Sequence, residues 1–159
     1  MNLSIRNRMG PLDLHIIVNG ASQSLMTYQR DGQGIFRCPA RCYGQHNNWR
    51  QPNGDTPPGL YRVGQLYDTQ GEAAYGQWCL DLEDLQGQET DNGRAGISLH
   101  GGGSGLADPF APYQGWQSTH GCIRLQNADL AKLVELIQRT KHQGGTVYLT
   151  VFYPDGRLA

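Results

Sequence analysis

A cysteine and two histidines, all next to glycines, are the residues of this chain whose types suggest chemistry. Cys122 and His120 lie in the stretch STHGCIRL, residues 118–125, and His100 lies upstream, directly before a run of glycines. The thiolate is the nucleophile in cysteine enzymes, and a free thiol is mostly protonated at neutral pH. His100 is therefore the candidate base, provided that the fold brings it beside Cys122.

The backbone around the cysteine could serve the same chemistry. Gly121 permits a tight turn and the close approach of a substrate carbonyl. The successive N–H groups of His120, Gly121 and Cys122 could face an oxyanion. The alternative is that Cys122 is a small buried apolar side chain and His100 an ordinary hydrogen-bonded histidine. The residue types alone leave both interpretations open.

The elements that would position these residues are mostly strands. Asn19-Gly20 and Asp31-Gly32 predict turns, and the polar segments 45–55 and 83–93 predict loops. In a strand ending at His100, alternation would place Ser98 and His100 on one face. Alternating apolar and polar residues predict strands at 12–18, 23–28, 34–38, 60–63, around 78–80, 96–100 and 145–153.

A single main helix is predicted after the cysteine. Asn127 is the expected N-cap, Asp129 suits the positive end of the helix dipole, and Gly144-Gly145 ends the helix. Apolar residues recur at helical spacing at Leu130, Leu133, Val134 and Ile137. We therefore predict a mainly β protein with one main helix, forming one domain over residues 1–159 with its core at about 12–153.

Composition excludes several classes of partner. The 159 residues include 22 glycines and 8 prolines, which favours a sheet-rich chain with many turns. The net charge is −1, and lysine and arginine never form a run, so we expect neither nucleic acid nor an anionic membrane surface as a partner. No stretch approaches the roughly 20 apolar residues that cross a bilayer, so no membrane insertion is expected.

The other cysteines could indicate a metal site. Cys38 and Cys42 are four residues apart, but structural zinc needs two more ligands, and the sequence has no second close pair of cysteine or histidine. We therefore expect no metal. Cys38 and Cys42 are expected either to form a disulfide or to remain unpaired or half-buried thiols, and the sequence assigns no role to Cys79.

The cysteine motif resembles that of a known family. His100 with its glycines, followed by 119–125 and then by Asn127, Asp129 and Leu133, is similar to the signature of the L,D-transpeptidase (YkuD) catalytic domain. The resemblance continues in Gln23, Leu25 and Tyr28, in DTPPGLYRV (55–63) and in the terminal strand at 145–147, so it extends from about Leu12 to Val151.

The resemblance implies a β-sheet-rich fold of sandwich type and a cysteine acyltransferase. Cys122 would be the nucleophile and His100 the base, with Thr119 and His120 supporting the site and the 120–122 backbone forming the oxyanion hole. The implied substrate is a peptidoglycan stem tetrapeptide. D-alanine would leave, a thioester would form at Cys122, and an amine would accept the acyl group in a 3→3 crosslink or an exchange of D-amino acids. No cofactor is implied.

The expected substrate-binding residues flank this motif: Ser118, Thr119, Arg124, Gly101, Trp116 and Tyr113. Arg124 is expected either to hold a substrate carboxylate or to brace the loop. The 18 residues between His100 and Thr119 slightly exceed the usual family spacing. They are expected to form either a mobile flap whose aromatic side chains line the cleft or a surface loop closed by Trp116 packing on the core.

Two questions stay open in the sequence. One is whether water replaces the amine, as in an L,D-carboxypeptidase or a wall-targeting effector, or whether the domain only binds peptidoglycan. The other is the route to the expected location, the periplasm or cell wall. Residues 1–18 lack a continuous apolar signal core, because Pro11, Asp13 and His15 interrupt it. A trimmed sequence, an injected effector and a cytoplasmic enzyme for recycled wall fragments would each explain this.

Overall fold

Eight strands and three helices form in residues 3–154, the part of the chain that the computed structural model describes. The mainly β prediction is confirmed. The elements are α1 (Leu3–Arg8), β1 (Leu14–Asn19), β2 (Ser24–Gln29), β3 (Gly34–Pro39), β4 (Gly59–Glu72), β5 (Gly76–Asp84), α2 (Gln88–Asp91), β6 (Ser98–His100), β7 (Ile123–Arg124), α3 (Asn127–His142) and β8 (Val147–Phe152).

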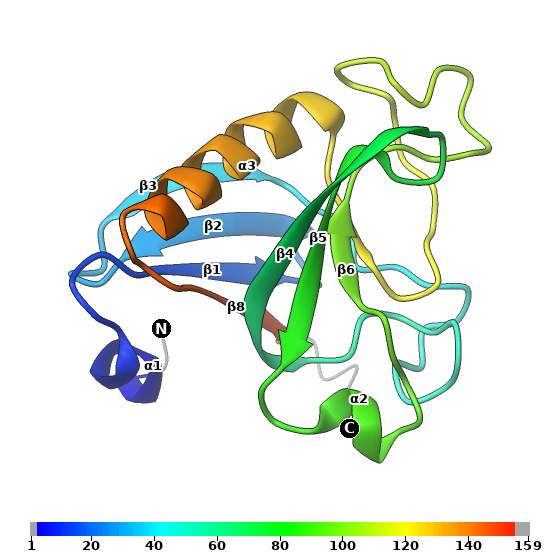
Figure 1. The fold of residues 1–159 in the computed structure, drawn as a ribbon. Helices are drawn as coiled ribbons and strands as arrows, with labels where there is room; N and C mark the ends of the chain where they lie inside the picture. The colour runs from blue at the N-terminus through cyan, green and yellow to red at the C-terminus, as the bar shows by residue number, and fades with distance from the viewer. Residues whose placement is uncertain (1–2, 155–159) are drawn as a thin grey trace.

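All eight strands belong to one mixed sheet, in the order β3-β2-β1-β8-β4-β5-β6-β7. The sandwich-type arrangement therefore consists of one continuous sheet whose two halves lie at a steep angle (Figure 1). The long strand β4 joins the halves, because it pairs with β8 at its start and with β5 along most of its length. The β1–β8 and β6–β7 pairs are parallel, and the other neighbouring strands are antiparallel.

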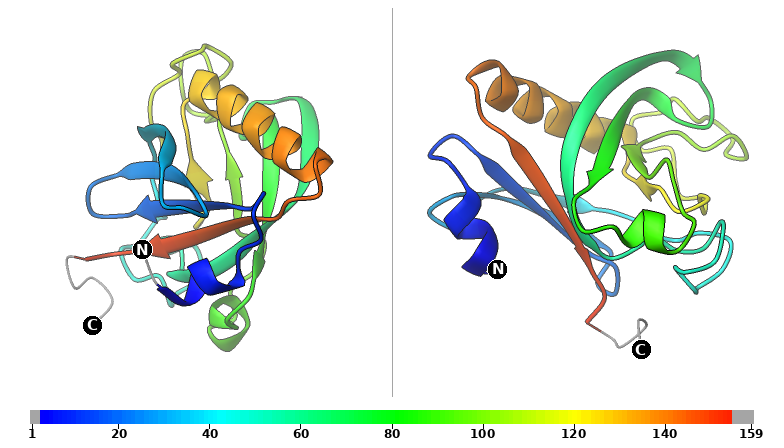
Figure 2. Two further views of the ribbon diagram at one scale, coloured as in Figure 1. Left: turned by 90° about the vertical axis from the view of Figure 1, so that its left-hand side faces the viewer. Right: turned by 60° about the horizontal axis from the view of Figure 1, so that its bottom comes forward.

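Helix α3 lies across both halves of the sheet and covers the core (Figures 1 and 2). Its apolar face is buried through Leu130, Leu133, Val134 and Ile137, as their spacing predicted. These side chains belong to one buried cluster that runs from Leu14 to Tyr153 and includes at least one residue of each of the eight strands. Burying each large aliphatic side chain stabilises the fold by about 1.5–3 kcal/mol.

The predicted N-cap of α3 is wrong by one residue. Gln126 is the cap, and Asn127 is the first residue of the helix. The Asn127 amide instead donates to the carbonyls of Pro109 and Ala111, both at 2.8 Å, and its Oδ1 accepts the Gly102 N–H at 3.0 Å. Polar groups of the 101–117 loop compete for this side chain, so it fixes the loop rather than the helix end.

Three short elements were not predicted. Ile5 of helix α1 and Met9, directly after the helix, are buried against Leu60, and two apolar side chains are too few for a recognisable period. Helix α2 has four residues and lies inside the predicted 83–93 loop, while β7 has only two residues. None of the helices in the described residues is long and apolar enough to span a membrane.

A buried histidine should make the fold sensitive to acid. His15 on β1 is 1% exposed, its Nε2 lies 2.8 Å from the Thr150 hydroxyl, and burial lowers its pKa from 6.5 to about 4. The unfolded chain therefore binds the proton more readily, so stability is lost as the pH falls from 6.5 towards 4. We expect His15 to account for about 2 kcal/mol of the stability lost between pH 7.5 and pH 5.

Urea unfolding at these two pH values would measure this loss. In His15→Gln the loss should be smaller by that amount, whereas the exposed His142→Gln, at the end of α3, should behave like the parent chain. An equal loss in His15→Gln and the parent would show that His15 does not contribute to the acid sensitivity.

Candidate active site

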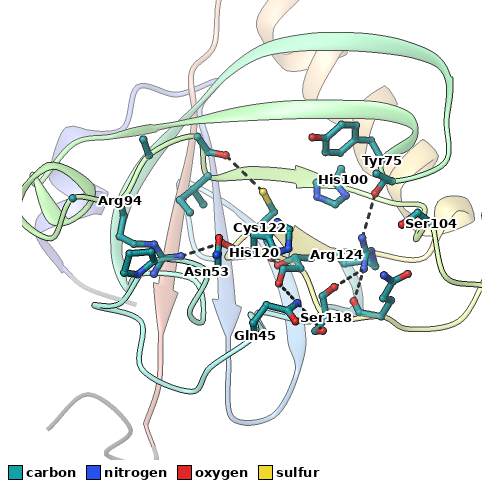
Figure 3. A pocket seen from close by; sticks show the side chains of 18 residues that line it. Gln45, Asn53, Tyr75, Arg94, His100, Ser104, Ser118, His120, Cys122 and Arg124 are labelled. Atoms are coloured by element: carbon teal, nitrogen blue, oxygen red, sulfur yellow. Dashed lines mark hydrogen bonds between the residues drawn. The ribbon is translucent and has the colours of Figure 1, made fainter.

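Cys122 and His100 border the same cavity, of about 560 Å³, at the β6–β7 end of the sheet (Figure 3). Strand pairing brings them together, because β6 and β7 run parallel with Leu99 opposite Ile123 and His100 opposite Arg124. Cys122 directly precedes β7 and so lies beside β6. Two residues that are distant in sequence thereby share one wall of the cavity.

The Cys122 thiol is uncharged in this environment. Its side chain is half-buried, and its Sγ lies 3.7 Å from the Gly96 carbonyl oxygen, to which it donates (Figure 3). Burial raises the thiol pKa from 9 to about 11, although a backbone hydrogen bond from Ser98 and the positive charge of Arg124 act in the opposite direction. The thiol therefore needs a base when it attacks.

His100 has the tautomer that such a base requires. Its Nδ1 lies 2.8 Å from the Gly101 carbonyl oxygen. A carbonyl only accepts, so Nδ1 carries the proton and Nε2 is left as the basic nitrogen. The side chain is 2% exposed, and burial lowers its pKa to about 4, so the imidazole is neutral at physiological pH.

The two pKa values predict how the thiol reacts. Because both groups are neutral at rest, the rate of alkylation of Cys122 by iodoacetamide should rise about tenfold per pH unit from pH 6 to pH 9. Peptide mapping by mass spectrometry, with the adduct quantified at Cys122, would measure the rate. A rate that is already constant below pH 7 would show a preformed thiolate–imidazolium pair instead.

Arg124 braces the loops around the site. It is 4% exposed, and its Nε donates to the Gly101 carbonyl at 3.3 Å and its Nη2 to the Ala74 carbonyl at 3.2 Å. Its Nη1 donates to the Gln117 carbonyl. Of the two roles expected for Arg124, these contacts match bracing. The Gly101 carbonyl that orients His100 is thus also held by a cation.

The turn before Cys122 is held by its own side chains. Thr119 Oγ1 accepts the Gly121 N–H at 3.0 Å and donates to the Cys122 carbonyl at 2.8 Å. The Gly121 N–H is therefore occupied, which differs from its expected place in an oxyanion hole. Gly121 has φ of +120°, a conformation that favours glycine. Ser118 and His120 are exposed at the rim, and the Ser118 hydroxyl accepts from Gln45 Nε2 at 3.1 Å.

The loop between His100 and Thr119 is fixed at several points. Besides the Asn127 contacts, the buried Gln114 donates to the Leu125 carbonyl at 2.9 Å, and Gln126 exchanges two hydrogen bonds with the Gly115 backbone. Of the two expectations for this segment, a surface loop describes it better than a flap. Trp116 lies under the Arg41 guanidinium at 4.4 Å and Tyr113 is 68% exposed, and neither lines the cavity.

Several residues of the cavity wall were not identified from the sequence. Tyr75, in the turn between β4 and β5, sets its ring edge-on to His100, with the centroids 4.9 Å apart. Arg94 is 6% exposed and donates to carbonyls of two loops, those of Gly54 at 3.1 Å and His120 at 3.3 Å among them. Neither residue belongs to a motif in the sequence, and no local signal marks either one as part of the site.

The remaining cysteines show no arrangement suited to a metal. Cys38 and Cys42 are buried in the main core, where burial raises the pKa of the Cys38 thiol to about 12. Within residues 3–154, no three histidine, cysteine, aspartate or glutamate side chains are grouped so that they could hold a metal ion.

Comparison with known proteins relates the chain to one family. The family model described as the L,D-transpeptidase catalytic domain, YkuD, matches residues 13–149. No curated protein matches the chain significantly in sequence.

Solved structures share the fold at low identity. A Bdellovibrio bacteriovorus protein, Bd1075, aligns with a TM-score of 0.64 at 18% identity over 92% of this chain and 49% of its own. The helical cell shape determining protein Pgp2 of Campylobacter jejuni gives 0.60 at 19%, over 88% and 47%. An L,D-transpeptidase of Stackebrandtia nassauensis gives 0.54 at 20%, over 87% and 55%. The chain spans about half the length of these structures.

Proposed function

Since the chain belongs to the L,D-transpeptidase catalytic domain (YkuD) family, we propose that it is a cysteine acyltransferase acting on peptidoglycan stem tetrapeptides. Enzymes of the family act on peptidoglycan in the periplasm or cell wall. The observation that carries the proposal is that the Cys122 thiol and a His100 of defined tautomer border one cavity.

The neutral pair supports a general-base mechanism. As the sulfur attacks the carbonyl carbon of the bond before the terminal D-alanine, the thiol proton passes to His100 Nε2. The carbonyl oxygen takes the negative charge of the tetrahedral intermediate. The carbon–nitrogen bond then breaks, the imidazolium returns the proton to the leaving D-alanine amine, and a thioester remains on Cys122.

The second half of the reaction reverses these roles. An amine of another stem, or a free D-amino acid, attacks the thioester carbonyl while His100 accepts the amine proton. When the intermediate collapses, the proton returns to the sulfur. Backbone N–H groups of the turn before the sulfur stabilise the oxyanion in both halves. Of these, the N–H of Cys122 is the principal donor, since the Gly121 N–H is taken by Thr119.

The other groups of the site hold the substrate and the catalytic residues. Thr119, His120 and Arg124 order the turn and the base, and Ser118 borders the approach of the peptide. The buried Gly101, which does not line the cavity, contributes through its carbonyl, which orients His100. No residue of this mechanism requires a cofactor. The catalytic domain corresponds to about residues 12–153, in line with one buried cluster extending from Leu14 to Tyr153.

Mass spectrometry of the products formed from a purified tetrapeptide muropeptide tests the proposal. A crosslinked dimer with loss of D-alanine is the expected result. A tripeptide without dimer would assign water as the acceptor and make the protein an L,D-carboxypeptidase. Unchanged substrate, together with no adduct on Cys122 after treatment with imipenem, would favour a domain that only binds peptidoglycan.

A further inference from the structure

Thr56 lies directly beneath the catalytic turn. It is the threonine of the Thr-Pro-Pro-Gly turn before β4 and is fully buried. Its hydroxyl donates to the Gly121 carbonyl oxygen at 2.7 Å, while the Cys42 carbonyl lies farther away at 3.3 Å. A hydroxyl has one proton, and the shorter contact is the better place for it. A residue 66 positions before the cysteine is thus hydrogen-bonded to the Gly121–Cys122 peptide unit.

That bond sets the direction of the Cys122 N–H. The Gly121 carbonyl and the Cys122 N–H belong to one planar trans peptide unit, in which they point in opposite directions. Because the carbonyl is bonded to buried Thr56, the N–H points to the opposite side, away from Thr56. Cys122 itself borders the cavity. Within the described residues, no hydrogen bond uses this N–H, so it is available to an oxyanion.

We infer that Thr56 is a positioning residue that aims the Cys122 N–H at the oxyanion of the acyl-transfer reaction. The inference rests on the proposed function. An oxyanion donor is effective only if it is fixed before the charge develops, because turning it during the reaction costs free energy. The buried Thr56 hydroxyl, by holding the Gly121 carbonyl, provides that preorganisation without touching the substrate.

The backbone of Thr56 is anchored by two hydrogen bonds, and that of its neighbour Pro57 by a third. The Thr56 N–H donates to the Cys42 carbonyl at 2.9 Å, and the Thr56 carbonyl accepts the Tyr153 hydroxyl at 2.7 Å. The adjacent Pro57 carbonyl accepts the Tyr61 hydroxyl at 2.7 Å. The hydroxyl therefore projects from a backbone that is held by Tyr153, directly after β8, and by Tyr61, at the start of β4.

The preceding peptide unit is fixed from the other side. Its carbonyl, that of His120, accepts from Arg94 Nη2 at 3.3 Å, and its N–H, that of Gly121, donates to Thr119. A Cβ on Gly121 would lie 2.1 Å from Arg94 Nη2, so this guanidinium packs directly against the glycine. Arg94 and Thr119 thus fix one peptide unit, and for the next one Thr56 is the hydrogen-bond partner that residues 3–154 provide.

The test compares two reactions of the same sulfur. Acylation by imipenem creates an oxyanion, whereas alkylation by iodoacetamide is a displacement at carbon that creates none. Thr56→Val keeps the shape but removes the hydroxyl, and we expect it to slow acylation by about 10- to 100-fold while alkylation at Cys122 stays unchanged. Thr56→Ser keeps the hydroxyl and should retain acylation close to that of the parent chain.

Thr140→Val is the matched control, because Thr140 is also buried and its hydroxyl donates to a carbonyl, that of Leu136 at 3.0 Å on α3, away from the site. It should leave both rates unchanged. If Thr56→Val does not fold, Thr56→Ala serves the same comparison. Equal acylation of Thr56→Val and the parent, or a parallel fall of both rates, would overturn the inference. A parent chain that is alkylated but resists imipenem would overturn the proposed function, and the inference with it.

Discussion

Cys122→Ala is expected to abolish thioester formation. The variant removes the only sulfur that borders the cavity within the described residues. The Thr119 hydroxyl beside it is already engaged with the Gly121 N–H and the Cys122 carbonyl. The rate of imipenem acylation, and of D-alanine release from a tetrapeptide, should fall to that of the buffer, a loss of at least about 10³-fold. Mass spectrometry of the intact protein and of the released D-alanine would measure both.

A second thiol provides the control for this variant. Cys79 on β5 is half-buried, and its Cα pairs with that of His100 on β6, but it does not line the cavity. Cys79→Ala should therefore be acylated like the parent. Full activity in Cys122→Ala, or loss of activity in Cys79→Ala alone, would show that Cys122 is not the nucleophile.

His100→Gln should slow acylation by about 10²- to 10⁴-fold, the usual contribution of general-base catalysis. Glutamine keeps polar contacts near the Gly101 carbonyl but cannot accept the thiol proton. Because the Cys122 thiol pKa is about 11, almost no thiolate is present at neutral pH to react without a base. The first-order rate of acylation at saturating imipenem would measure the effect.

The pH dependence separates a lost base from a damaged site. As the pH rises towards 11, hydroxide deprotonates the thiol directly, so the deficit of His100→Gln should shrink steadily. A deficit that stays the same at every pH would indicate a structural defect. The exposed His142→Gln should match the parent throughout, and a similar deficit in that variant would show that the assay does not report on the base.

Much of the fold was predictable because its signals are local. Alternation over a few residues, the Asn-Gly turn after β1 and the helical spacing from Leu130 to Ile137 depend only on near neighbours along the chain. The family motif identified the two candidate reacting residues for the same reason, because His100 with its glycines and the block around Cys122 are each contiguous in sequence. Short elements such as β7 escaped prediction because two residues carry no period.

The tertiary structure decided what depends on residues far apart in sequence. Burial sets the low pKa of His100 and the high pKa of Cys122, and neither shift follows from residue type. Which polar atoms meet was also unpredictable: Asn127 bonds the loop instead of capping its helix, and Arg124 is committed to carbonyls. The contact between Thr56 and Gly121 exists only because β4 begins beneath the catalytic turn. The sequence by itself determined which residues are candidates for the reaction, whereas long-range packing determined their protonation and which of their backbone groups are already hydrogen-bonded.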